Sequence, residues 1–304
     1  MKPNIQRILA PGLMILLLWT FTWQNVCAQK HTENALFWKI SGKGIDNPSY
    51  LFGTYHLLSG GYLNEVPEVG KAFEQADGIV VEAQLDSSKM FQLMPMMVMS
   101  GKKLSDLVSE TEYALIKTEV EKTTGTSMDM LAQFKPVSVT FMLTVAYAHK
   151  EGGSELNKYD GPPIDNHFAN VGKKNKKPIA TFETMEEQVR IVFDHDPVEE
   201  QARQLVEFVR SKEDMIQAQS DLLKMYLNQD LDGLYKLYKK YEKQFGDASY
   251  LLDDRNVKWM EKLPGMIEKG NQFIAVGALH LAGDKSLIRL LRKSGYTLTP
   301  VAVR

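Results

Sequence analysis

The fold is decided by a phrase that occurs twice, as LFGTYHL at residues 51–57 and as AVGALHL at residues 275–281. Each copy is an apolar, strand-like run followed by Gly-x-x-His-Leu, and the two copies lie in opposite halves of the chain. Glycine lets the backbone leave a strand sharply or pass close to another group. The two histidines, His56 and His280, are therefore expected just past the carboxyl ends of their strands, where open α/β sheets build binding sites.

Two acidic residues occupy comparable positions. Glu82 follows the short β-branched run at residues 78–81, and Glu183 follows the apolar run at residues 179–182. A carboxylate directly after a buried strand either pairs with a cation or helix terminus or serves a site. If these strands share a sheet and point one way, both acids and both histidines converge on one rim. Such a set could hold a divalent metal ion or position a water for metal-free hydrolysis.

Strand patterns occur near both ends of the chain, and helical patterns fill the space between them. The helical periodicity covers residues of about 87–160 and 184–269, and Thr184 with Glu187 forms a capping box at the start of the second stretch. The sequence therefore predicts an α/β fold in which a central β-sheet is built from the N- and C-terminal halves and carries a large helical insert. We expect this fold to occupy residues 29–304 as one domain.

Residues 1–28 have the pattern of a secretory signal peptide, with two basic residues, an apolar run at 8–23 and a small residue at the cleavage position, Ala28. An uncleaved anchor is the alternative, although the apolar run is short for a membrane span. We expect an exported protein, periplasmic or secreted, with no transmembrane span after signal removal. The only cysteine, Cys27, lies inside this predicted signal peptide. After signal removal, any metal site must therefore use His, Asp or Glu.

The overall charge excludes one broad class of partner. The formal net charge is −2, from 36 basic and 38 acidic residues, and no long basic block is present. Nucleic acid is therefore not an expected partner. The chain also lacks the H-E-x-x-H helix, the G-x-S-x-G elbow, the Walker loop and the dinucleotide glycine fingerprint, which excludes several common enzyme classes.

A series of short phrases follows the same order along the chain as in one known family. In order they are FWKI at 37–40, YLFGTYH at 50–56, VVE at 80–82, ID at 164–165, FETMEEQ at 182–188, DRNVKW at 254–259, FIAVGALHLAG at 273–283 and GY at 295–296. On these phrases, residues 36 to 303 resemble the TraB/GumN family. That family includes the pheromone-shutdown protein PrgY, and it is similar to the Tiki metalloproteases that cleave Wnt proteins and, in fold, to the erythromycin esterases.

The resemblance implies an active centre made by the two Gly-x-x-His motifs and one glutamate. In this chain these residues are His56, His280 and Glu82. They would bind a divalent metal (manganese, cobalt or zinc), with Glu82 acting as a ligand or as the general base. Four further residues would bind substrate or orient the ligands: Glu183, Asp165, Arg255 and Asn256.

The sequence thus predicts an exported hydrolase, in the first place a metal-dependent peptidase acting on a peptide or protein substrate. Two alternatives stay open: a metal-free, esterase-type hydrolase with the same residues, and a non-catalytic protein that sequesters a peptide or pheromone. The supporting residues also have structural interpretations. Asp165 could cap the helix that follows it, and Arg255 could belong to a structural Arg–acid pair. Because His56, Glu82 and His280 follow strands, we expect them outside the packed interior.

Overall fold

Six strands form one mixed sheet in the order β4-β3-β5-β2-β1-β6. The computed structural model describes residues 34–84 and 90–303, and the predicted signal peptide lies outside them. Strands β4, β3, β5 and β2 run parallel, whereas β1 pairs antiparallel with both β2 and β6. The strands are β1 (Phe37–Ser41), β2 (Ser49–Thr54), β3 (Gly78–Val81), β4 (Ile179–Thr181), β5 (Gln272–Gly277) and β6 (Thr297–Pro300).

The repeated sequence phrase becomes two neighbouring strands. In the pairing of β2 with β5, Gly53 lies opposite Val276 and Thr54 lies opposite Gly277. A Cβ atom on Gly53 would lie 2.9 Å from the Cα of Ala278, so glycine is what allows this close approach. The two Gly-x-x-His segments therefore leave the sheet side by side at the same edge.

Helices fill most of the remaining chain, and the predicted α/β fold with a helical insert is confirmed. The predicted capping box is present at the start of α7, where the Thr184 side chain accepts a hydrogen bond from the Glu187 N–H. The α-helices are α1 (Pro67–Gln75), α2 (Met90–Leu93), α3 (Glu110–Thr124), α4 (Met128–Leu131), α5 (Pro136–Leu156), α6 (Ile164–Lys174), α7 (Met185–Phe193), α8 (Val198–Arg210), α9 (Lys212–Leu227), α10 (Leu231–Phe245), α11 (Ser249–Trp259), α12 (Leu263–Ile267) and α13 (Leu287–Lys293).

Short 3-10 helices complete the chain. They are η1 (Gly60–Asn64), η3 (Met94–Met97), η4 (Leu104–Asp106) and η5 (Ala278–Leu281). The first helical stretch continues past residue 160 as α6, which packs on β3. Among the described residues, no helix combines the length and the apolar composition that crossing a membrane requires.

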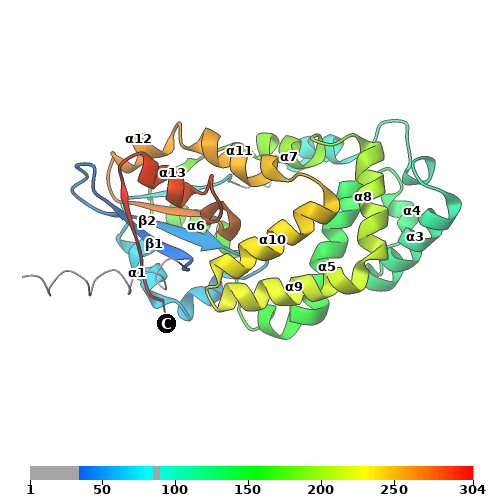
Figure 1. Cartoon of the computed structure of the whole chain (residues 1–304), viewed down its shortest axis with the longest axis horizontal. Helices are drawn as coiled ribbons and strands as arrows, with labels where there is room; N and C mark the ends of the chain where they lie inside the picture. Colours follow the sequence, from blue (N-terminus) through cyan, green and yellow to red (C-terminus); the bar gives the residue numbers. More distant parts are fainter. Residues whose placement is uncertain (1–33, 85–89, 304) are drawn as a thin grey trace, which may run out of the picture. The chain divides into compact units, whose positions relative to one another are not determined.

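Two separate hydrophobic cores stabilise the described chain. The first surrounds the sheet, where the rings of Phe168 and Phe273 lie 4.8 Å apart and pack with Phe52. The second is formed by buried residues of η4, α3, α4, α5, α8 and α9, and in it Tyr147 stacks on Phe208 at 5.7 Å. Figure 1 shows α3, α4 and α8 of this group on the far side of α10 from the strands. The insert therefore has a core of its own.

Candidate functional site

The four parallel strands each deliver one site residue to the same edge of the sheet. In sheet order, Glu183 follows β4, Glu82 follows β3, His280 lies in η5 after β5, and His56 follows β2. Glu183, Glu82 and His280 are buried, with 2%, 8% and 2% of their surface exposed. The expectation that these side chains lie outside the packed interior is therefore wrong for Glu82 and His280. The side chain of His56 is 64% exposed and lies at the solvent side.

His280 is held in one orientation by Asn256 from α11. The Asn256 amide nitrogen donates to the backbone carbonyls of His280 and Lys285, at 3.1 and 2.9 Å. Its side-chain oxygen is thus an acceptor, so His280 Nδ1 carries the hydrogen of their 2.7 Å bond. Nε2 therefore carries the lone pair, and it lies 3.6 Å from Glu82 Oε1. Burial lowers the pKa of His280 to about 3, which keeps the ring neutral.

His56 pairs with Asp165 from the first turn of α6. His56 Nδ1 donates to Asp165 Oδ2 at 2.8 Å, and the Thr54 hydroxyl donates to the other carboxylate oxygen at 2.5 Å. Desolvation lowers the pKa of His56, but the charge and hydrogen bond of Asp165 and the charge of Glu82 raise it to about 9. Asp165 does not cap α6, whose N-cap is Pro163. Its carboxylate instead orients the imidazole so that Nε2 faces the site.

Glu82 is fixed through both carboxylate oxygens. Oε1 accepts the Gly277 N–H at 2.7 Å, and Oε2 accepts from Arg255 Nη2 at 2.6 Å and from Gln188 Nε2 at 3.2 Å. Burial raises the pKa of Glu82, but the positive charges facing it and the Gly277 N–H lower it to about 2. Because His280 is neutral, we assign this lowering mainly to Arg255 and His56. Glu82 is ionised at neutral pH.

Arg255 joins these groups from α11 and uses every N–H it has. Its Nη1 donates to the Leu251 carbonyl at 3.0 Å and to His280 Nε2 at 3.2 Å. Its Nη2 donates to Glu82 Oε2 and Glu183 Oε1, and its Nε donates to Glu183 Oε2 at 3.3 Å. A guanidinium has five N–H donors, so Arg255 is saturated by the chain itself. It holds both glutamates, which is the structural Arg–acid pair, and it also contacts His280.

Gly277 lies between His56 and Glu82. A Cβ atom placed on this glycine would lie 3.2 Å from His56 Nε2 and 3.3 Å from Glu82 Oε1. These two atoms therefore approach Gly277 closely, and any larger residue at position 277 would crowd both of them. Within residues 34–84 and 90–303, no hydrogen bond to His56 Nε2 is present.

The donor atoms fit a divalent cation by type and by tautomer. His56 and His280 both hold their Nδ1 hydrogen in a bond to an oxygen, which is the arrangement that metal-ligating histidines use. His280 would offer Nε2 directly, His56 would offer Nε2 after losing its second proton, and Glu82 would offer Oε1. No group of three or more His, Cys, Asp or Glu side chains in the described part of the chain is already arranged as a metal site. Arg255 Nη1 occupies the His280 lone pair, so the set is incomplete while that contact is made.

Two residues of this centre were not among the predicted site residues. Gln188, one turn into α7, bridges the two glutamates through bonds of 3.2 Å to Glu82 and 3.3 Å to Glu183. Trp259 lies under the Arg255 guanidinium at 4.7 Å and donates its indole N–H to Glu183 at 3.3 Å. Both occur inside the quoted family phrases at 182–188 and 254–259, but neither type of side chain by itself indicates a site.

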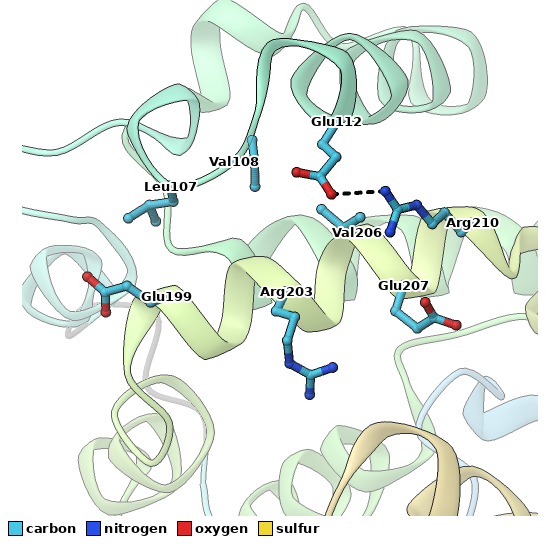
Figure 2. Close-up of a pocket in the computed structure, with 8 residues that line it drawn as sticks. All are labelled: Leu107, Val108, Glu112, Glu199, Arg203, Val206, Glu207 and Arg210. Carbon is cyan, nitrogen blue, oxygen red and sulfur yellow. Dashed lines mark hydrogen bonds and ion pairs between the residues drawn. The ribbon is translucent and has the colours of Figure 1, made fainter.

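A hollow lies in the helical region. Its volume is about 310 Å³, and Figure 2 shows its lining from α8, the start of α3 and the segment before α3. Arg210 pairs across it with Glu112 at 2.9 Å. Arg203 pairs with Glu200 along α8. The lining carries three acidic and two basic side chains and no histidine, so it lacks the imidazole groups found at the sheet edge.

Fold and site together define an α/β protein whose parallel strand ends gather two Gly-x-x-His histidines, two glutamates and an arginine. The sequence model of the TraB/PrgY/gumN family matches residues 36–300, and the chain belongs to this family. It is similar to the uncharacterized protein YbaP of Shigella flexneri, with 24% identity over 248 residues that cover 80% of this chain and 88% of that protein. No solved structure matches the chain.

Proposed function

We propose that the chain is an exported hydrolase that cleaves peptide bonds at the centre formed by His56, Glu82 and His280. The observation that carries this proposal is the convergence of His56 Nε2 and Glu82 Oε1 beside Gly277. A protonated imidazole and an ionised carboxylate that lie near one point are the arrangement that general acid–base chemistry requires.

The roles of the side chains follow from their charges. In this proposal the attacking water would contact both Glu82 Oε1 and His56 Nε2. As this water attacks the carbonyl carbon, ionised Glu82 accepts its proton, and protonated His56 gives a proton to the leaving nitrogen as the C–N bond breaks. Asp165 holds the His56 ring in position throughout. Arg255 cannot bind the carbonyl oxygen without giving up a carboxylate or His280, because its donors are all used.

The metal-dependent form of the proposal gives the same residues different roles. His56, which would have to lose its Nε2 proton, His280 and Glu82 would be ligands, and the bound divalent cation would polarise the scissile carbonyl and lower the pKa of a water toward neutrality. This help matters here because a carboxylate with a pKa of about 2 is a weak base toward ordinary water. Manganese, cobalt and zinc all accept a mixed imidazole and carboxylate set.

A metal-free hydrolase is the second candidate, and one observation favours it. His280 Nε2 already accepts a hydrogen bond from Arg255, so only His56 presents a free imidazole nitrogen. A single histidine backed by a carboxylate, as His56 is by Asp165, is sufficient to handle the proton in esterase-type hydrolysis.

The test combines metal analysis of the purified protein with cleavage of a fluorogenic peptide library. Cleavage that chelator abolishes and that manganese, cobalt or zinc restores supports the metallopeptidase. Ester hydrolysis that chelator leaves unchanged supports the metal-free candidate. Tight peptide binding without turnover contradicts both and points to sequestration. Export is checked separately by N-terminal sequencing of the protein recovered outside the cytoplasm, which should begin at Gln29.

A further inference from the structure

Arg255 occupies a place that a cation bound by the proposed centre would need. Its Nη1 lies 3.2 Å from His280 Nε2, and its Nη2 lies 2.6 Å from Glu82 Oε2. The imidazole and the carboxylate are the two ligands that the strand ends β5 and β3 supply. A guanidinium satisfies such acceptors much as a divalent ion does, but its charge cannot be removed at physiological pH.

We propose that Arg255 competes with a divalent cation for His280 Nε2 and holds the centre in a metal-free resting state. Binding of the cation would require Nη1 to leave His280 Nε2. The remaining donors of Arg255 keep the guanidinium on Glu82 and Glu183, so the side chain turns without leaving the cluster. This inference rests on the proposed function for the identity of the ligands, but it concerns binding and not turnover.

The charges of the cluster support an exchange of this kind. The cluster holds three carboxylates, on Asp165, Glu82 and Glu183, and one guanidinium, so with His56 neutral, as a ligand must be, the fixed charges leave two negative charges that a divalent cation would offset. The centre is largely buried, with the Arg255 side chain 11% exposed, and an uncompensated charge is costly there. Arg255 therefore lowers the attraction for a cation while it stabilises the empty form.

The experiment measures Co²⁺ binding by calorimetry and visible absorption in the wild type and in Arg255→Gln. We expect Arg255→Gln to bind Co²⁺ at least about tenfold more tightly, because a positive charge next to the ion is removed and His280 Nε2 is released. If Arg255 only orients the ligands, the same change should weaken binding by about 10–100-fold. The two roles thus predict opposite signs, and unchanged or weaker binding overturns the inference.

A matched control removes a positive charge from the same helix. Lys258 is 51% exposed and pairs with Glu187 at 3.2 Å, so Lys258→Gln should leave Co²⁺ affinity unchanged. Should Arg255→Gln fold poorly, Arg255→Lys takes its place, since an ammonium cannot span both carboxylates and His280. Arg255→Lys should still bind Co²⁺ more tightly than the wild type, and Co²⁺ should raise its melting temperature by more.

The outcomes separate this inference from the proposed function. Tighter Co²⁺ binding by the variant without any hydrolysis in the wild type supports the competition and contradicts the hydrolase. Hydrolysis in the wild type, together with unchanged or weaker Co²⁺ binding by the variant, overturns the competition alone. No Co²⁺ binding by either protein also overturns the competition.

Discussion

Two buried glutamates, Glu82 at the sheet edge and Glu119 in the helical insert, have the same exposure but different surroundings. Glu119 lies on α3 with 7% of its surface exposed, close to the 8% of Glu82. It accepts hydrogen bonds from Lys212 at 3.0 Å, from the Thr123 hydroxyl at 2.9 Å and from the Tyr147 hydroxyl at 3.1 Å. Each glutamate is thus paired with a cation and further satisfied by neutral donors.

The difference lies in what else faces the carboxylate. The partners of Glu119 come from α3, α5 and the start of α9, and none of them is an imidazole. Glu82 instead lies 3.6 Å from His280, and its Oε1 and His56 Nε2 both lie beside Gly277. A buried glutamate with a cation is therefore insufficient evidence for a site. The convergence of several titratable side chains from parallel strand ends is the informative feature.

The largest contrast is expected in turnover. Glu82→Gln keeps the shape of the side chain but removes the basic oxygen, so peptide cleavage should fall by about 10²–10⁴-fold. Glu119→Gln should leave the cleavage rate of the folded protein unchanged, because it lies in the other core. Steady-state kinetics on both variants, with folding checked by circular dichroism, measures this. Equal losses of activity in the two variants would remove the distinction between a site glutamate and a structural one.

The next contrast concerns the residue behind His56. Asp165→Asn removes the charge that orients the imidazole, and turnover should fall by about 10–100-fold. Asp160→Asn is the matched control, since Asp160 is an exposed acid just before α6. Initial rates with one peptide substrate suffice for the comparison. If Asp165→Asn and Asp160→Asn had the same small effect, Asp165 would have only a structural role with Thr54.

Much of the sheet could be predicted from sequence because its strands are short apolar runs. The run at 78–81 is flanked by Asp77 and Glu82. All four of its residues are buried, as expected for a central parallel strand. The meeting of His56 and His280 follows from the parallel pairing of β2 and β5, which the repeated phrase indicates. Helix ends were less predictable. For example, the first helical stretch is expected to end near residue 160, but helix α6 follows it and extends to Lys174.

The contacts of Arg255 could not be predicted in the same way. Its partner Glu82 is 173 positions away in sequence, and the packing of α11 against the strand ends decides that they meet. A helical arginine has the same local pattern whether it faces solvent or a buried carboxylate. The burial of Glu82 and His280 also depends on the helices that cover the edge, and strand patterns carry no information about those helices.

Stability should report the structural role of Glu119. Glu119→Gln loses charge-assisted hydrogen bonds from Lys212 and two hydroxyls, and the free energy of unfolding should fall by about 1–3 kcal/mol. Urea denaturation at neutral pH measures this. As a control, Glu121→Gln on the same helix weakens only an ion pair of 3.9 Å with Lys117, because a glutamine oxygen can still accept the Met128 N–H, and it should have a smaller effect. The reverse order would contradict the structural role of Glu119.

The smallest expected effect is the pH dependence of that difference. Burial raises the pKa of Glu119, but its bonds to Lys212, Thr123 and Tyr147 outweigh this and lower it below the ordinary value of 4.5. Around these pKa values the folded state therefore binds fewer protons than the unfolded state. The stabilisation by ionised Glu119 is present above pH 4.5 and is lost as the pH falls below that value. The difference in the free energy of unfolding between the wild type and Glu119→Gln should therefore become smaller as the pH is lowered from 6. A constant difference would contradict the shifted pKa.

The central claim is that His56 and His280, brought together by the two Gly-x-x-His strand ends, form one catalytic centre. The most direct measurement is peptide-library cleavage by the double variant His56→Ala/His280→Ala, with manganese or cobalt present and the fold verified by circular dichroism. We predict that cleavage falls to the background rate. Cleavage at the wild-type rate by the folded double variant would contradict the claim.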